Sequence, residues 1–372
     1  MQKVRFILIK VIFLENTIDN GADGNTLINS NMKKIKIIHL INADTIGGVE
    51  VGAKLAQTEC RKFMDYEIRY IYNTEDTWIK KFIKLFQTAK LLLVESKKKD
   101  NQIILSSLWM SHIVSLIVKT FSKNTTWISF IHNSNYSNKL NYLVCTKLTY
   151  LADKQVFDSY STSKAYNNKE INQSRIVNYF FENYDLKKFD IQYWSNREYD
   201  FIMVARNTKQ KGFLELENFC THISSQYPSR PKFMIITNDI KEILDLQNFK
   251  IKLQDICEIN FRTNLSNSEV LRYLTESKVY FCLSHFEGFG ITILESILSG
   301  CFVITTNVGE QKNYMLPERR LVIENKNNYK LDIEYIKNNG PSKENFDKSK
   351  EFLFKKVQTY GKSLHKIVIE EN

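Results

Sequence analysis

Residues 279–309 read VYFCLSHFEGFGITILESILSGCFVITTNVG, and this stretch decides the fold. An apolar, β-forming run comes first, followed by a turn with Gly288 and Gly290 and then by a short apolar segment of helical character that Gly300 ends. A second apolar run completes the stretch. A buried strand that leads through a glycine turn into a helix is how α/β proteins build sites for phosphates and sugars. The stretch therefore predicts a ligand site at the carboxyl end of a parallel sheet.

Two carboxylates, Glu287 and Glu295, stand on either side of this turn with seven residues between them. The spacing of Ser284 and Glu287 also fits a capping box, but the glycines directly after Glu287 argue against a helix that starts at Ser284. We expect the helix to begin near Gly290, with free N–H groups from its first turn facing a ligand. The helix dipole would favour an anion there by about 0.3–1 kcal/mol.

Strand and helix patterns alternate along the whole chain. In the first half, strands are expected at residues 34–41, 66–73, 102–109 and 125–133, and the alternation continues through 155–181. It resumes at residue 199, after a polar stretch at 183–200 that we take as the linker between two domains. Alternation of this kind predicts parallel sheets covered by helices on both faces. The tail after residue 343 is expected to form a charged amphipathic helix.

Composition limits the partners of the protein. Among 372 residues, 52 Lys and Arg stand against 41 Asp and Glu, and residues 1–200 carry +8 of the net +11. A basic first half indicates an anionic partner, which could be nucleic acid, an anionic membrane surface or a phosphorylated substrate. The six cysteines include no C-x-x-C pair, which argues against a zinc site or a disulfide framework and fits a reducing cytosol. No apolar run is long enough to predict a transmembrane helix.

The predicted helix at 77–100 is unusual in its surface. It carries seven lysines against Glu95 and Asp100, and Trp78, Phe82 and Phe86 recur at near-helical spacing. Such a helix can lie on an anionic membrane. It can equally be an ordinary crossover helix whose lysines face water, and the sequence leaves both interpretations open.

Three further residues are candidates for chemistry. Arg206 and Lys211 lie in a loop after a strand, and two cations at this spacing could clamp a diphosphate. His132 falls at the carboxyl end of its strand, where open α/β sheets place ligand-contacting residues, although a single histidine in such a place is more often structural.

The segment Glu287–Glu295, E-G-F-G-I-T-I-L-E, resembles the E-x7-E motif of retaining glycosyltransferases of the GT-B fold, in particular family four. Residues 47–50 are similar to the glycine loop of that family, and Arg206 to Gly212 match its R-x4-K-G spacing. The resemblance covers most of the chain from about Lys33. It implies two Rossmann-like domains that face each other across a cleft, with a C-terminal helix that returns to the N-terminal domain.

We accordingly expect residues 1–32 to be a leader outside the fold and residues 33–183 to form the acceptor-side domain. Residues 184–345 are then the domain that binds the nucleotide sugar, and residues 346–372 the returning helix.

The resemblance also implies roles at the donor site. Glu287 would contact the donor sugar, and Glu295 would hold the ribose hydroxyls. Backbone amides between the two glutamates would bind the diphosphate and neighbouring hydroxyls, and these belong to Phe289, Gly290, Ile291 and Thr292.

The other roles concern charge and the first domain. Arg206 and Lys211 would neutralise the diphosphate leaving group, Gly48 would approach the donor phosphate or the acceptor with its backbone, and His132 would bond near the reacting sugar. We expect no cofactor and no metal, because two cations and a helix N-terminus can stabilise the diphosphate. No D-x-D pattern stands at a strand end.

Three positions depart from the family pattern. Residues 178–181 read N-Y-F-F where N-G-V-D is usual, and we expect this to affect the interdomain crossover more than the site. His132 is followed by Asn133 rather than the commoner Asp, and Glu310 stands where a small residue is frequent. The last two place the contacts to the acceptor in question more than those to the donor.

The expected activity is transfer of a sugar from a nucleoside-diphosphate sugar to a hydroxyl of a lipid-linked glycan in bacterial cell-surface polysaccharide synthesis. The enzyme would be cytoplasmic, with peripheral contact at the inner face of the membrane and no nucleic-acid partner. Rival readings are a sugar-nucleotide epimerase of the same fold, a basic nucleic-acid or surface-binding protein, and an inactive subunit. If the protein bound nucleic acid through its basic residues, the paired glutamates would have no function.

Overall fold

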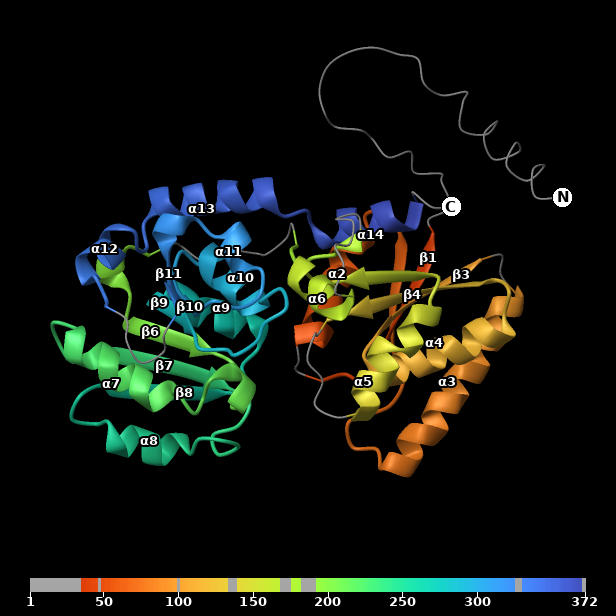
Figure 1. The fold of residues 1–372 in the computed structure, drawn as a ribbon, viewed down its shortest axis with the longest axis horizontal. Helices are drawn as coiled ribbons and strands as arrows, with labels where there is room; N and C mark the ends of the chain where they lie inside the picture. Colours follow the sequence, from red (N-terminus) through yellow and green to blue (C-terminus); the bar gives the residue numbers. More distant parts are fainter. Residues whose placement is uncertain are drawn as a thin grey trace, which may run out of the picture. The chain divides into compact units, whose positions relative to one another are not determined.

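The structure is a computed structural model that describes residues 35–45, 48–98, 101–132, 139–167, 175–181, 192–324 and 330–369. The predicted leader at 1–32 lies outside these residues, as does the first part of the predicted linker. The domain boundaries inferred from the sequence therefore remain predictions. The described chain contains two parallel sheets (Figure 1).

The first sheet has five strands in the order β2-β1-β3-β4-β5, all parallel. Crossing helices connect them in the sequence, as parallel pairing requires. The strands are β1 (Lys36–Ile41), β2 (Asp65–Tyr70), β3 (Gln102–Ser107), β4 (Thr125–Ile131) and β5 (Lys154–Phe157). The helices are α2 (Gly48–Cys60), α3 (Trp78–Lys98), α4 (Trp109–Phe121), α5 (Lys139–Thr146) and α6 (Tyr160–Asn167).

Alternate residues of these strands face different helices, which gives the sheet two apolar cores. Ile38 and Ile104 pack against α3 and α4 on one face. Ile37 and Ile103 pack on the other face, in a core that also contains residues of α2 and of the last helix, α14 (Tyr360–Ile369). Because both faces are buried, the strands read as nearly continuous apolar runs in the sequence.

The second sheet has six parallel strands in the order β11-β10-β9-β6-β7-β8. They are β6 (Tyr199–Val204), β7 (Lys232–Thr237), β8 (Glu258–Thr263), β9 (Ser277–Cys282), β10 (Phe302–Thr306) and β11 (Arg320–Ile323). The α-helices around it are α7 (Leu216–Gln226), α8 (Leu246–Lys252), α9 (Asn267–Thr275), α10 (Ile291–Leu298), α11 (Gln311–Tyr314) and α12 (Ile333–Asn338). The stretch quoted above forms β9, α10 and β10, and these lie next to one another because β9 pairs with β10.

The tail forms two helices, and the prediction of one helix was wrong. Helix α13 (Lys343–Lys356) packs against α10 and α11 of the second sheet, whereas α14 packs against α2 of the first (Figure 1). The chain between them is extended at Val357. The N–H of Tyr360 donates to the carbonyl of Phe180 over 2.7 Å, and that of Gly361 donates to Glu59 Oε1 over 2.8 Å. The C-terminal helix therefore returns to the first sheet, as the resemblance implied.

Three local predictions also differ from the structure. The strand expected at 102–109 ends at Ser107, because Leu108 has a positive φ of 75° that turns the chain into α4. Residues 175–181 form a single bridge between Ile176 and Phe157 instead of a strand. Helix α8 was not predicted, since it is short and mostly polar, although Asp245 caps it in the usual way.

Candidate active site

A cavity of about 360 Å³ lies among residues that follow strands of both sheets. The structure brings to its lining each of the ten residues that the sequence predicted for the site. They are Gly48, His132, Arg206, Lys211, Glu287, Phe289, Gly290, Ile291, Thr292 and Glu295. This result places them together; it leaves their individual roles as predictions.

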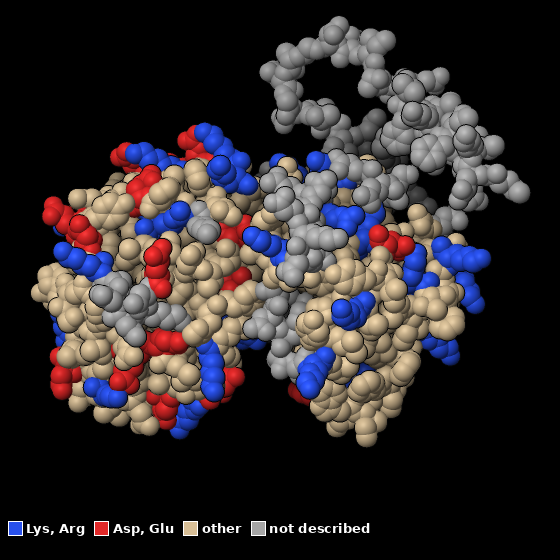
Figure 2. Space-filling model, viewed as in Figure 1, with Lys and Arg blue, Asp and Glu red and all other residues tan. Residues whose placement is uncertain are grey.

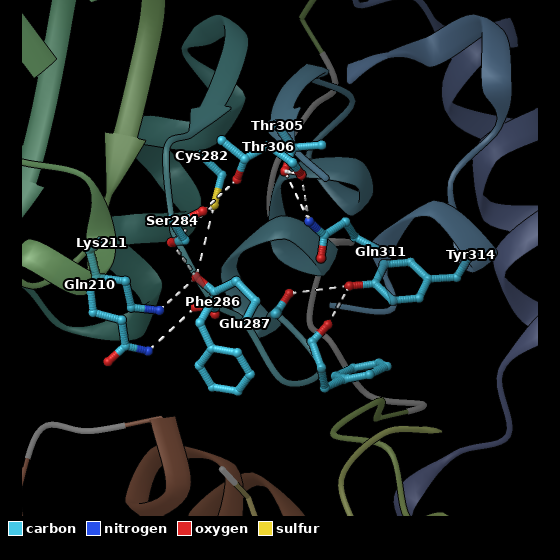
Figure 3. A network of polar contacts seen from close by, with 12 residues as sticks. Gln210, Lys211, Cys282, Ser284, Phe286, Glu287, Thr305, Thr306, Gln311 and Tyr314 are labelled. Atoms are coloured by element: carbon cyan, nitrogen blue, oxygen red, sulfur yellow. Dashed lines mark hydrogen bonds and ion pairs between the residues drawn. The ribbon is translucent and has the colours of Figure 1, made fainter. Parts of the chain in front are cut away.

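Glu287 is held by a cation and a hydroxyl. Lys211 Nζ lies 2.6 Å from its Oε1 atom, and Ser284 Oγ donates to the same oxygen over 2.6 Å (Figure 3). Ser284 is buried, and its own carbonyl accepts from Thr306 Oγ1 over 2.5 Å. Ser284 and Glu287, whose spacing resembles a capping box, do not cap a helix, since α10 begins only after Gly290. Instead Ser284 orients the side chain of Glu287.

Lys211 is fixed by the glycine that follows it. Gly212 has a φ of 80°, and a Cβ atom placed on it would lie 2.3 Å from the carbonyl oxygen of Leu283. A side chain at this position would both strain the backbone and collide with β9's continuation. The glycine lets the loop that carries Lys211 pass directly against the segment that leads to Glu287.

Arg206 extends from the loop after β6 and is exposed at the cavity. Within the residues that the structure describes, its guanidinium has no hydrogen-bond or ion-pair partner. The neighbouring Asn207 is fully buried and holds the loop: its Nδ2 donates to the carbonyls of Asp239 and Leu244, and its Oδ1 accepts from the N–H groups of Ile243 and Leu244. The loop is therefore rigid at its base, while its charged side chain is available to a ligand.

The glycine turn leads into α10 as predicted. Gly290 has a φ of 79° and occupies the N-cap position, so the first amides of the helix open toward the cavity. Tyr314 OH donates to the carbonyl of Phe289 over 2.5 Å and fixes the turn from α11 (Figure 3). An N-terminus of this kind is suited to bind an anion.

Glu295 lies on α10 and is almost completely buried. Its Oε1 accepts from Asn267 Nδ2 over 2.7 Å, and Asn267 is the first residue of α9. Burial raises the pKa of Glu295 to about 7, although the Asn267 bond opposes that change. A carboxylate with this pKa can exchange its proton near neutral pH, and hydroxyl groups of a ligand could stabilise its charged form.

His132 is buried directly after β4, with both ring nitrogens near hydroxyl groups. Its Nε2 lies 2.8 Å from Ser107 Oγ, and its Nδ1 lies 3.2 Å from Tyr179 OH. Burial and the nearby rings of His39 and His112 hold the pKa of His132 well below its usual range. The imidazole is therefore neutral at physiological pH and can donate with one nitrogen and accept with the other.

Tyr179 corrects one expectation. The N-Y-F-F departure at 178–181 was expected to affect the crossover more than the site, but Tyr179 lines the cavity and contacts His132. Gly52 on α2 makes room for it, since a Cβ there would lie 2.3 Å from the tyrosine ring. The departure from the N-G-V-D pattern marked residue 179 in the sequence, but no local pattern showed that the Tyr179 ring faces the cavity.

Asp158 was also missed. It follows β5, lines the cavity and lies against the glycine turn, where a Cβ placed on Gly288 would come 2.5 Å from its Oδ2. Burial raises the pKa of Asp158 to about 7, against hydrogen bonds from Thr162, Ser159 and the backbone of Phe289. Gly288 is thus needed so that the glycine turn of the second sheet can approach Asp158, which follows the first sheet. No motif in the sequence marked Asp158.

The charges around the cavity suit a diphosphate. Lys211, Arg206 and the amino end of α10 supply positive potential, and Glu287 is placed beside Lys211. Among the described residues, no three His, Cys, Asp or Glu side chains gather closely enough to hold a metal ion. No described helix has the length and apolarity to cross a membrane.

Comparison with known proteins agrees with this architecture. Residues 186–351, which contain all six strands of the second sheet, match the family Glycosyl transferases group 1. A comparison with curated proteins gave no match.

Solved structures resemble the chain over most of its length. The apo form of the lipopolysaccharide outer core galactosyltransferase WaaB is 14% identical with a TM-score of 0.63, and the alignment covers 91% of this chain and 100% of that one. HepE from Anabaena, solved with UDP and glucose, is 12% identical with a TM-score of 0.65, covering 91% and 99%. A glycosyltransferase from Rickettsia africae is 16% identical with a TM-score of 0.61, covering 91% and 97%.

At these identities the solved structures establish a shared fold, which is GT-B, and the family match adds the catalytic class. The matched domain and the shared fold together indicate that this chain is a glycosyltransferase.

Proposed function

We propose that the protein transfers a sugar, with retention of the anomeric configuration, from a nucleoside-diphosphate sugar to a hydroxyl of a lipid-linked glycan in cell-surface polysaccharide synthesis. The observation that carries the proposal is the pair of Glu287 and Lys211, 2.6 Å apart in one cavity with Arg206 and the amino end of α10. HepE, which shares the fold, binds UDP and glucose, so a UDP-sugar is the first donor to test. We place the chain in family four on the strength of its E-x7-E spacing.

In the proposed chemistry the bond from the anomeric carbon to the diphosphate breaks, and the acceptor oxygen bonds to that carbon on the same face while its proton passes to the departing diphosphate. Lys211, Arg206 and the α10 amides stabilise the charge that develops on the departing diphosphate. Glu287 orients the donor sugar, and Glu295 accepts hydrogen bonds from the ribose. In this scheme the protein supplies the stabilising charge itself, and no metal is required.

The first experiment screens nucleotide sugars by thermal shift, because a donor that binds only the folded state raises the melting temperature. The donor that stabilises the protein is then supplied in labelled form, with and without a glycan acceptor. Acceptor-dependent appearance of a labelled glycan supports transfer. Conversion of the donor to its epimer without an acceptor would instead support the epimerase alternative, and no turnover of any stabilising donor would support an inactive subunit.

A second feature supports the lipid-linked part of the proposal. Five large apolar residues on the first turns of α3 are exposed, Trp78 by 64% and Ile79 by 75% among them. The others are Phe82, Ile83 and Phe86. The helix already buries a separate stripe of Leu85, Ala89 and Leu92 against the sheet, so this outer band is additional to its core contacts.

The outer band is accompanied by charge and lies near the cavity end of its sheet. Lys80, Lys81 and Lys84 belong to the same turns, and Leu140 and Leu143 of α5 are exposed as well. In Figure 2 the surface in the region of α3 and α5 is mostly uncharged, with Lys and Arg side chains around it. Since α3 starts after a parallel strand, its first turns lie at the carboxyl edge of the sheet, as does His132. An apolar band with lysines fits an anionic membrane, and we propose peripheral binding at the inner face of the cytoplasmic membrane.

Vesicle flotation tests this surface. We expect the wild type to float with phosphatidylcholine vesicles that contain phosphatidylglycerol, and the double variant W78S/F82S to lose most of this binding because apolar burial and charge act together. Ile251→Ser, which removes an exposed apolar residue from α8, is the control and should bind as the wild type does. Equal flotation of W78S/F82S and wild type, or no binding of the wild type, would contradict the proposal.

A further inference from the structure

A chain of polar contacts leads from His132 into the core of the first sheet. Ser107 Oγ, which lies 2.8 Å from His132 Nε2, is also 2.7 Å from His39 Nε2. The other nitrogen of His39, Nδ1, is hydrogen-bonded to Tyr66 OH. Ser107 and His39 are completely buried, and Tyr66 is nearly so.

The chain crosses four adjacent strands and ends on the last helix. His132 follows β4, Ser107 ends β3, His39 lies on β1 and Tyr66 on β2, which are neighbours in the sheet. Tyr66 OH then lies 3.3 Å from the hydroxyl of Tyr360, at the start of α14. A row of polar groups inside an apolar core destabilises the fold unless every group has a hydrogen-bond partner. Each donor in the row must therefore face an acceptor.

The single proton of Ser107 links the two histidines. The hydroxyl can donate to only one imidazole, and the arrangement that satisfies both rings has it accept from the other. If His132 carries its proton on Nε2, His39 must present a lone pair there, and the reverse holds as well. Burial lowers the pKa of His39 to about 3, so both rings are neutral and each has one proton to place.

The choice matters at the nitrogen of His132 that remains for a ligand. Nε2 lies 2.8 Å from Ser107 Oγ, and Tyr179 OH lies 3.2 Å from Nδ1 and 3.5 Å from Nε2. His132 and Tyr179 both line the cavity, so a ligand hydroxyl would share Nδ1 with Tyr179 or replace it there. When Nε2 carries the proton, Nδ1 can only accept a hydrogen bond; when it does not, Nδ1 can only donate. The buried row of hydrogen bonds therefore decides whether His132 donates a hydrogen bond to a sugar hydroxyl or accepts one from it.

We propose that Ser107 is a positioning residue which, by bridging His132 to His39, fixes the tautomer and the orientation of the His132 ring. The inference rests on the proposed function, in which His132 bonds near the reacting sugar. Tyr66 and Tyr360 extend the bridge, so that helix α14 supports the site from a distance.

Ser107→Ala is the test of activity. We expect kcat for transfer to fall about ten- to a hundredfold, the loss seen when a group that orients a metal-binding histidine is removed, with little change in the KM of the donor. Ser107→Thr keeps the hydroxyl and should recover most of kcat. The control is Ser115→Ala, which removes an equally buried hydroxyl whose bond goes only to the carbonyl of Ser111 in its own helix.

Nitrogen NMR of histidine-labelled protein reads the tautomers directly, without need of substrate. The chain has six histidines, and single His39→Gln and His132→Gln spectra assign the two of interest. We expect wild type to show two neutral rings of opposite tautomer, and Ser107→Ala to change the tautomer balance of at least one. A shared tautomer in the wild type, or unchanged ring signals in Ser107→Ala, would overturn the proposal.

The two hypotheses fail in different ways. If Ser107→Ala keeps the wild-type kcat while Lys211→Ala is inactive, Ser107 has no positioning role and the proposed function still stands. Full activity of Lys211→Ala would remove the proposed function, and the tautomer measurement would still decide whether Ser107 couples the two histidines.

Discussion

Lys211→Ala and Glu287→Ala should each lower kcat for transfer by about a hundred- to a thousandfold, the effect of removing one preorganised group that stabilises transition-state charge. The two side chains are 2.6 Å apart, and Ser284 orients Glu287 from the other side. Each variant therefore loses its own contact with the donor and also releases its partner. Steady-state kinetics with the donor found by thermal shift measure the effect.

A control for this prediction stands in the same short turn. Lys209 is exposed two residues before Lys211, so Lys209→Ala removes a charge from the loop without touching Glu287. It should keep at least most of the wild-type kcat. In the double variant K211A/E287A the fold-loss in kcat should be smaller than the product of the two single fold-losses, because the two residues act on one contact. Near-normal activity of either single variant would reject the assignment of this pair.

Glu295→Gln should make the protein more stable relative to wild type as the pH rises. The pKa of Glu295 is about 7 in the folded state against an ordinary value of 4.5, because burial disfavours its charged form. Between these two values the folded state binds the extra proton, so wild type loses stability as the pH rises from about 4.5 to 7 and then levels off. The difference amounts to about 3 kcal/mol, and glutamine, which stays neutral and can still accept from Asn267, avoids it.

Urea unfolding of both proteins over a pH series measures this difference. Glu269→Gln provides a contrast of opposite sign: Ser266 lowers the pKa of Glu269, so that this carboxylate stabilises the protein at higher pH and its variant should lose stability there. A constant difference between wild type and Glu295→Gln across the series would show that Glu295 is not a buried carboxyl with a raised pKa.

The sequence was sufficient to predict which residues of the second sheet line the cavity, because most of them belong to one local unit. Glu287, the glycine turn and Glu295 lie on one strand–turn–helix unit, and glycine at 290 is what allows the left-handed N-cap from which α10 starts. Gly212 lets the loop that carries Lys211 pass directly against this unit, and the R-x4-K-G spacing had marked both residues in the sequence. Short-range patterns carry such information well.

The first sheet's contribution could not be read in the same way. Tyr179 and Asp158 come from different loops, and each resembles an ordinary loop residue until the fold places it at the cavity. Ser107 ends β3 and lies behind the cavity wall, where it contacts His132. The break between α13 and α14 was hidden for a related reason. The helical pattern reads through residues 357–359, whereas the chain leaves the helix there, and the N–H groups of Tyr360 and Gly361 then donate to Phe180 and to Glu59 of α2.

The anomeric configuration of the transferred sugar tests the central claim most directly. With an α-linked UDP-sugar as donor and a hydroxyl acceptor, proton NMR of the purified product reports the new linkage. We predict an α-linked product whose formation requires the acceptor. A β-linked product would contradict retention, and an epimerised donor with no new glycosidic bond would contradict transfer itself.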